Sequence, residues 1–225
     1  MFNKMAEMLS EFSEVGLPVW IALGTLVALA ALLLSVGKAR GRLNATALAY
    51  AALAVALSFL LSNIRLFRMP QGGSITPASM LPLMLFAHAF GVVPGLVAGL
   101  AYGVLQFLQT PGLLPIPPLY ALAQIALDYL LAFGVLGLAG IGARKGEREA
   151  LYLPLGIALA SLLRFLCHVL SGALFFAEYA GDQNPLLYSA GYNSYMFLEM
   201  LICIVLGLLI GPRLAKIMRR SAGIR

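Results

Sequence analysis

The fold is decided by the stretch LYALAQIALDYLLAFGVLGLAGI, residues 119–141. It is long and apolar enough to cross a bilayer as a helix, yet it carries Asp128 near its middle. A carboxylate in hydrocarbon costs about 2.5–3.5 kcal/mol on insertion scales, so such a group usually faces a partner or a cavity. Because Tyr120, Gln124 and Asp128 recur at helical spacing, they are predicted to share one helix face, with Tyr129 beside it. The remaining segments must therefore supply the residues or the cavity that this polar face contacts.

The composition is that of a membrane protein that crosses the bilayer several times. The chain has 225 residues, of which 61% are hydrophobic and 11% charged, and its mean hydropathy is +0.94. The net charge is +6, but the basic residues sit at the ends of apolar runs, so membrane orientation explains them better than nucleic-acid binding. Cys167 and Cys203 lie inside apolar runs and are interpreted as small buried hydrophobes without a disulfide.

The hydropathy pattern predicts an all-α, polytopic membrane helical bundle. Residues 1–42 form an N-terminal segment with one extra transmembrane helix, and residues 43–225 form a six-helix domain. The predicted spans are 17–36, 43–62, 77–90, 91–109, 119–141, 151–177 and 188–212. The span 77–90 is short and contains Pro82, so it is expected to be tilted, broken or shielded by its neighbours.

Basic residues predict the orientation of this bundle in the cell membrane, with the N-terminus outside and the C-terminus cytoplasmic. The segments expected on the inside contain Lys38, Arg40, Arg42, Arg144, Lys145, Arg148, Arg213, Lys216, Arg219, Arg220 and Arg225. Only Lys4, Arg65 and Arg68 fall in segments expected outside. An excess of Lys and Arg marks the cytoplasmic side of multi-pass proteins.

Two rows of small residues predict close helix packing. The first row is Gly91, Gly95, Gly99 and Gly103, which we interpret mainly as packing within the bundle. The second row, on the 43–62 span, is Ala45, Ala49, Ala52 and Ala56, with Ala54 and Ser58 on another face. This second row fits either packing within the chain or docking of another membrane subunit, and the sequence leaves both open.

Polar residues from several spans fall at one depth, in the outer half of the membrane. They are Asp128, His168, Tyr188, Asn193, Tyr102 and Gln106. A carboxylate attracts a cation, aromatic faces bind cations and flat rings, and Asn and His bond ring nitrogens and amines. The sequence thus predicts a pocket for a small, flat, partly cationic ligand. The alternative is an Asp128–Arg164 ion pair that only joins two helices.

Sequence motifs for other functions are missing. The chain contains no P-loop, Rossmann fingerprint, HExxH or GxSxG, so no cofactor or metal is expected, and uphill movement of a ligand would need a partner or an ion gradient. An intramembrane enzyme with Asp128 and His168 as an acid/base pair is disfavoured, because no nucleophile motif or second carboxylate accompanies them. A structural membrane protein without a ligand remains a rival interpretation.

Several motifs together resemble one known family. They are GGSITPASMLPLMLFAHAFG at 72–91, LVAGLAYGVLQFL at 96–108, LAQIALDYLLAFGVLGLAG at 122–140, and RFLCHVLSGALFFAEYA followed by YSAGYNSY between 164 and 195. In this order they resemble the thiamine-specific S-component, the substrate-binding subunit, of energy-coupling factor transporters. The resemblance implies a six-helix domain with a thiamine pocket near the outer face. It also implies partners: a transmembrane coupling subunit and two ATPase subunits, so the chain itself would not be an enzyme.

The resemblance also implies roles for individual residues. The substrate-binding positions would be Asp128, Tyr129, His168, Phe176, Tyr188, Asn193 and Tyr102. The row Ala45, Ala49, Ala52 and Ala56 would dock on the coupling subunit. Separately from the resemblance, the glycines of the loop 63–76 permit movement, so this loop is expected to act as a gate. The only tryptophan, Trp20, lies in the extra helix, so Tyr and Phe would supply the stacking rings. Another vitamin or a thiamine precursor is the main alternative ligand.

Overall fold

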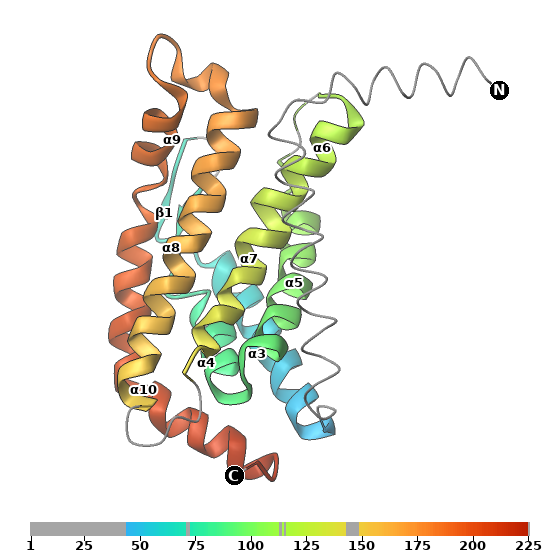
Figure 1. Cartoon of the computed structure of the whole chain (residues 1–225), viewed down its shortest axis with the longest axis vertical. Helices are drawn as coiled ribbons and strands as arrows, with labels where there is room; N and C mark the ends of the chain where they lie inside the picture. Colours follow the sequence, from blue (N-terminus) through green and yellow to red (C-terminus); the bar gives the residue numbers. More distant parts are fainter. Residues whose placement is uncertain (1–43, 71–72, 113, 115, 143–148, 225) are drawn as a thin grey trace, which may run out of the picture.

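The computed structural model describes residues 44–70, 73–112, 114, 116–142 and 149–224. The described chain is a bundle of helices with one short hairpin (Figure 1). In chain order the elements are α3 (Ala45–Asn63), β1 (Phe67–Arg68), β2 (Ser74–Ile75), α4 (Leu81–Phe90), α5 (Val92–Gln109), α6 (Pro118–Ile125), η1 (Ala126–Leu131), α7 (Ala132–Gly134), η2 (Val135–Gly140), α8 (Glu149–Phe175), η4 (Ala177–Ala180), α9 (Pro185–Asn193) and α10 (Met196–Ser221). The predicted extra span 17–36, with Trp20, lies outside the described residues and stays a prediction.

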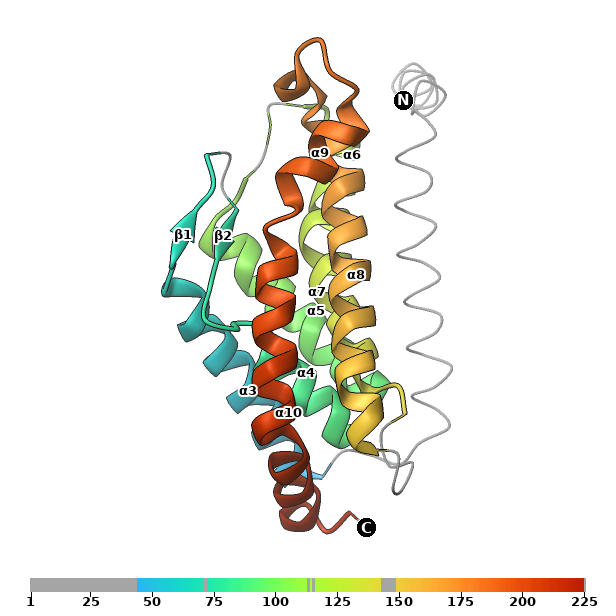
Figure 2. The ribbon, with the colours of Figure 1, turned by 90° about the vertical axis from the view of Figure 1, so that its left-hand side faces the viewer.

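The helical membrane bundle predicted from hydropathy is confirmed. Five helical stretches are long and apolar enough to cross a membrane by length and composition. These are Ala45–Asn63, Val92–Gln109, Pro118–Gly140, Leu151–Phe175 and Pro185–Ser221. The small departure from an all-α fold is the hairpin, in which Phe67 pairs with Ile75 and Arg68 with Ser74. Figure 2 shows it at the side of the bundle, and β2 contacts α10.

The short helix α4 forms the centre of the bundle. Its ten residues span only about 15 Å, roughly half the hydrocarbon thickness. All of them except Pro82 are buried, and α3, α5, α10 and η2 surround the helix. A helix that is apolar on every side must be covered on every side, which accounts for the shielding expected for 77–90.

The decisive stretch 119–141 is one rod in outline but not one continuous α-helix. It begins as α6, widens to a π-helix in η1, returns to α in α7 and tightens to a 3₁₀-helix in η2. Its glycine contacts with α5 confirm the packing role of the glycine row: a methyl group on Gly95 would lie 2.8 Å from the Gly137 Cα atom. Gly91, however, does not belong to α5; its φ of 103° places it at the turn between α4 and α5.

The last span also differs from the prediction. The range 188–212 was expected to be one helix, but α9 and α10 are separate, joined through Ser194 and Tyr195, and α10 runs on to Ser221. Pro212 lies inside α10, and the C-terminal turns of this helix cross the base of the bundle (Figure 1). The Asn44 side-chain amide donates to the Ala222 carbonyl at 2.6 Å and fixes this end against α3.

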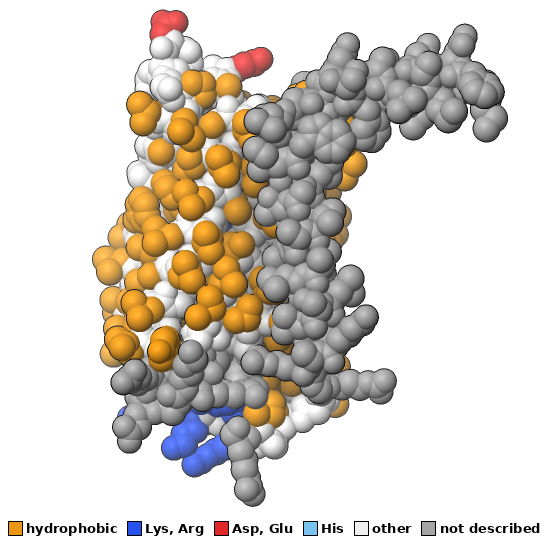
Figure 3. Space-filling view, viewed as in Figure 1, with side chains coloured by type: hydrophobic (Ala, Val, Ile, Leu, Met, Phe, Trp, Pro, Cys, Tyr) orange, Lys and Arg blue, Asp and Glu red, His pale blue; other side chains and the backbone are white. Residues whose placement is uncertain are grey.

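Charged side chains lie at the two ends of the bundle. In Figure 3 acidic side chains appear at the end that carries α9, and basic side chains at the opposite end. The exposed acidic residues Glu178 and Asp182 lie in η4 and just before α9, and the exposed basic residues Arg213, Lys216 and Arg220 lie in the C-terminal turns of α10. On the face shown in Figure 3, the surface between the two ends is largely apolar, and exposed apolar side chains of the bundle include Leu162, Leu201 and Leu209, as expected for a surface in lipid.

Candidate ligand-binding cavity

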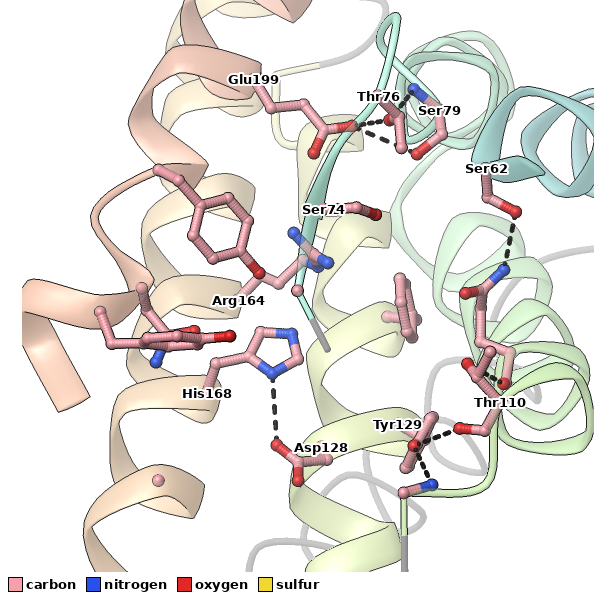
Figure 4. Close-up of a pocket in the computed structure, with 18 of the residues that line it drawn as sticks. Ser62, Ser74, Thr76, Ser79, Thr110, Asp128, Tyr129, Arg164, His168 and Glu199 are labelled. Atoms are coloured by element: carbon pink, nitrogen blue, oxygen red, sulfur yellow. Dashed lines mark hydrogen bonds and ion pairs between the residues drawn. The ribbon is translucent and has the colours of Figure 1, made fainter. Parts of the chain in front are cut away.

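A cavity of about 490 Å³ lies between the hairpin and the helices α5, α8, α9 and α10, with η1 and α7 closing one side. This volume falls in the range of small-molecule sites. Figure 4 shows polar side chains from these elements pointing toward a common space. The predicted binding residues all line it: Asp128, Tyr129, His168, Phe176, Tyr188, Asn193 and Tyr102.

Asp128 is paired with His168 across the cavity. The His168 Nδ1 atom lies 3.2 Å from the Asp128 Oδ1 atom, and the side chains are 19% and 16% exposed, respectively (Figure 4). The predicted alternative, an Asp128–Arg164 ion pair, is not formed: among the described residues, the Asp128 carboxylate is paired with the His168 imidazole, one helical turn from Arg164 on α8. His168 Nε2 has no hydrogen-bond partner within the described chain.

The π-helix η1 sets the direction of Asp128. A π turn holds more residues than an α turn and is frequent at functional sites. Asp128 and the neighbouring Tyr129 both line the cavity, whereas Tyr120 and Gln124 do not, so the face predicted from four-residue spacing does not continue through η1. Gln124 is instead fully buried, and its Nε2 atom donates to the Gly112 carbonyl at 2.6 Å.

Tyr129 connects the cavity to the loop after α5. Its hydroxyl donates to the Thr110 carbonyl at 2.7 Å and accepts from the Gly112 amide at 3.0 Å. Its ring meets the Phe107 ring edge to face, with centroids 5.3 Å apart. A methyl group on Gly103 would lie 2.6 Å from the Tyr129 carbonyl oxygen, so the glycine lets α5 approach this turn. Tyr129 is thereby fixed before any ligand arrives.

Tyr102 is held equally firmly but offers little surface. Its ring is 1% exposed and stands edge to face against Phe133, with centroids 5.0 Å apart. Its hydroxyl donates to the Ser58 carbonyl at 3.2 Å and accepts from Gln106 Nε2 at 3.0 Å. A ring so covered cannot present a free face to a ligand. The structure therefore favours a supporting role over the stacking role expected from sequence.

The helix α9 forms one wall of the cavity, called the outer wall below, and packs on α8 at a glycine of α8. A methyl group on Gly172 would collide with the Ser189 hydroxyl, so this glycine allows the two helices to touch. Ser189 donates to the Val169 carbonyl at 2.9 Å, and Asn193 Nδ2 donates to the Ser189 carbonyl at 2.9 Å. The Asn193 side chain is thus oriented by its own helix.

Aromatic rings gather around this outer wall. Tyr188 and Tyr192 lie nearly parallel, 18° apart, with centroids separated by 6.5 Å. Phe176, at the end of α8, lies 6.2 Å from Tyr179 at an angle of 32°. All of these side chains line the cavity and keep part of their surface open. They supply the faces for flat or cationic groups that the sequence predicted from aromatic content.

Two charged residues were given no binding role from sequence. Glu199 is 2% exposed and accepts hydrogen bonds from the hydroxyls of Thr76 and Ser79. Arg164 lies over the Phe133 ring at 5.0 Å, and its Nε and Nη1 atoms are buried without a hydrogen-bond partner in the described chain. The signal for Glu199 was available, because it is a carboxylate inside an apolar run as Asp128 is.

The two small-residue faces of α3 have different surroundings. Ala45, Ala49, Ala52 and Ala56 are exposed, whereas Ala47, Ala54, Ser58 and Ser62 are buried against the bundle. Packing within the described chain therefore uses the face with Ala47, Ala54, Ser58 and Ser62, and leaves the face with Ala45 and Ala56 uncovered. Among the described residues, no group of three or more His, Cys, Asp or Glu side chains could hold a metal ion.

Comparisons with known proteins identify the family. The sequence profile of the thiamine transporter protein family (Thia_YuaJ) matches residues 48–218. The chain belongs to the thiamine transporter family. It is 37% identical over 168 residues to thiamine transporter ThiT of Bacillus subtilis strain 168, a match that covers 66% of this chain and 81% of that protein.

A solved structure agrees with the fold. ThiT from Listeria monocytogenes superposes with a TM-score of 0.64 at 22% identity, covering 76% of this chain and 96% of that one. The membrane helical bundle is therefore that of the thiamine transporter family. The range matched by the family profile, 48–218, includes every residue that lines the cavity and leaves out the N-terminal residues 1–47.

Proposed function

We propose that this member of the thiamine transporter family is the thiamine-binding subunit, or S-component, of an energy-coupling factor importer. It captures thiamine in the cavity near the outer face and delivers it inward. The observation that carries the proposal is the Asp128–His168 pair in a ring-lined membrane cavity. Thiamine combines a cationic ring with a flat aminopyrimidine, and the cavity offers a carboxylate for the charge and donors, acceptors and rings for the rest.

The Asp128–His168 pair supplies both charge and hydrogen bonds. When His168 carries its proton on Nδ1 and donates it to Asp128, the pair keeps a net negative charge, and Nε2 becomes an acceptor. The charge offsets that of the ligand in a site where solvent screens weakly. The Nε2 atom, which has no partner in the described chain, accepts from the ligand's exocyclic amine.

The remaining roles follow the shape of the outer wall. Phe176, with its ring partly open to the cavity, stacks on the ligand. Tyr188 and Asn193 bond the pyrimidine edge; the hydrogen bond from the Asn193 amide nitrogen to the Ser189 carbonyl orients this side chain, and its amide oxygen accepts from the ligand. Tyr102 and Tyr129 fix the opposite wall through their own hydrogen bonds.

The partner proposal rests on the uncovered face of α3. Ala45, Ala49, Ala52 and Ala56 form a flat exposed row, and small residues let a second helix approach closely in a membrane. We assign this face to the transmembrane coupling subunit, which joins two ATPase subunits that supply the energy. The acidic end of the bundle would then face outside and the basic end the cytoplasm.

Equilibrium binding by the purified full chain tests the ligand. Radiolabelled thiamine is titrated in lipid nanodiscs, with unlabelled thiamine, its hydroxymethylpyrimidine precursor, riboflavin and biotin as competitors. We expect saturable binding that only unlabelled thiamine displaces at matched concentration. Displacement by the pyrimidine alone at equal potency would shift the assignment to a precursor transporter, and absence of saturable thiamine binding would refute the proposal.

A further inference from the structure

Residues 73–79 form one wall of the cavity; its second half is packed into the bundle, with Ala78 2% exposed, whereas residues 73–75 are only half-buried. Gly73, Ser74, Thr76 and Ser79 line the cavity from this side. The strands preceding and following the hairpin turn make only two residue pairs. Leu66 and Phe67, on the first strand side, are 62% and 58% exposed, so this side packs little against the protein. The position of the wall must therefore depend on the contacts of residues 73–79 themselves.

Glu199 makes the principal polar contact with this wall. Its Oε1 atom accepts from the Thr76 hydroxyl and, at 3.2 Å, from the Ser79 hydroxyl. The Ser79 amide donates in turn to the Thr76 hydroxyl oxygen at 3.2 Å. All three side chains are nearly inaccessible, at 2% for Glu199, 4% for Thr76 and 5% for Ser79. A buried carboxylate whose partners come from the wall ties that wall to α10, because leaving any member unpaired is costly.

Two further features of the backbone support this attachment. Gly73 comes so close to Tyr195 that a methyl group there would lie 2.7 Å from the Tyr195 Cζ atom. Tyr195 is one turn before Glu199, so the same part of the chain contacts the wall at both of its ends. Between Thr76 and Ser79, Ala78 has a φ of 62°, which a side chain other than glycine adopts only when its surroundings hold it there.

Glu199 also lies on the segment that carries ligand-binding groups. Tyr188 and Asn193 precede it in α9, and α9 continues into α10 through Ser194 and Tyr195. Any displacement of the wall from Glu199 would open the cavity on the side opposite Asp128 (Figure 4). The Glu199 Oε1 atom accepts from the two hydroxyls, and the proposed hydrogen bonding of thiamine assigns no role to Glu199.

We propose that Glu199 is the positioning residue that holds the 73–79 wall against α10 and thereby sets how long a ligand stays in the cavity. The second part of this inference rests on the proposed function, and the first does not. Removing the carboxylate leaves two buried hydroxyls without their acceptor and frees the wall. A glutamine keeps one acceptor oxygen at the same reach, so it should largely preserve the attachment.

Hydrogen exchange of the ligand-free full chain in nanodiscs tests the attachment. For Glu199→Met we expect exchange in the peptide covering 73–80 to become about tenfold faster or more, while α5 keeps its wild-type rate. Glu199→Gln should stay within about threefold of wild type. Thr76→Val, which removes a donor from the other side, should reproduce the effect of Glu199→Met. Ser161→Ala removes another buried hydroxyl, on α8, and should change nothing at 73–80.

The dissociation rate of thiamine tests the consequence. Glu199→Met should release thiamine about tenfold faster with association changed less than about twofold, and Glu199→Gln should restore slow release. Unchanged exchange at 73–80 in both Glu199→Met and Thr76→Val would overturn the proposal, as would a uniform rise that includes α5. Failure of wild type to bind thiamine would refute the proposed function instead, and the exchange comparison would still decide the role of Glu199.

Discussion

The His168 imidazole changes what the burial of Asp128 costs. A lone carboxylate in hydrocarbon is expensive, but here its Oδ1 atom lies 3.2 Å from a ring nitrogen, and the π turn of η1 directs it into a cavity. Sequence placed both residues at one depth from helical rise, and in the structure their side chains meet. It could not decide between His168 and Arg164 as the partner, because these residues are one turn apart on the same helix and the choice depends on rotamers.

Phe176 offers a test of stacking at the scale of one side chain. Phe176→Ala should weaken thiamine binding about tenfold, since a ring contact beyond simple burial is worth about 0.5–1.5 kcal/mol and its buried area adds to this. Phe176→Trp should bind at least as tightly as wild type, because the indole face is larger and attracts cations more strongly. Isothermal titration calorimetry of both variants measures the effect.

Phe165→Ala is the matched control, because that ring packs on Phe197, with centroids 4.8 Å apart, and does not line the cavity. It should alter stability while leaving the dissociation constant for thiamine within about twofold of wild type. Equal losses of affinity in Phe176→Ala and Phe165→Ala would show that the Phe176 ring does not contact the ligand.

At the scale of elements, hydropathy predicted where helices occur. It did not predict where a helix changes its type or is interrupted. The apolar runs gave every described span and the short, shielded α4, because burial in lipid or protein selects such runs. The π turn in η1 and the break between α9 and α10 were missed, since both segments consist of residues that tolerate an ordinary helix. Tertiary contacts decide these local shapes, and local sequence does not contain them.

The junction of α8 and α9 gives a prediction about one element. Gly172→Ala should push α9 from α8, because the added methyl group meets the Ser189 hydroxyl. Asn193 would move with α9, so thiamine affinity should fall about tenfold or more, as expected when an overpacked contact costs 1–3 kcal/mol. Scintillation proximity binding of labelled thiamine provides the measurement.

Gly191→Ala serves as the control on the same helix, because nothing lies within 4 Å of the position where its methyl group would be. It should preserve affinity and raise thermal stability slightly, since Ala favours helix over Gly by about 1 kcal/mol at most. A loss of binding in Gly191→Ala as large as that in Gly172→Ala would refute the close-packing explanation.

At the scale of the whole molecule, a substitution in the exposed alanine row of α3 should affect transport and leave thiamine binding unchanged. Ala52→Trp adds bulk to an exposed position, so the isolated chain should bind thiamine as wild type does. ATP-dependent thiamine uptake with the coupling module should fall about tenfold or more, because a bulky residue at a close helix contact costs about 1–3 kcal/mol.

Ala101→Trp controls for bulk elsewhere, since Ala101 is also exposed but lies on α5. Uptake should remain within about twofold of wild type for this variant if the two positions are independent. Comparable loss of uptake in both variants would argue against α3 as the docking face.

The central claim is that the cavity around Asp128 binds thiamine, and a pair of single substitutions tests it most directly. Asp128→Asn removes one charge beside His168, whereas Asp182→Asn removes one from an exposed position that does not line the cavity. Calorimetric titration with thiamine should show affinity reduced about a hundredfold or more for Asp128→Asn, since the attraction between unit charges about 4 Å apart is worth about 4 kcal/mol at an effective dielectric constant of about 20, and no change for Asp182→Asn. Wild-type affinity in Asp128→Asn would contradict the account.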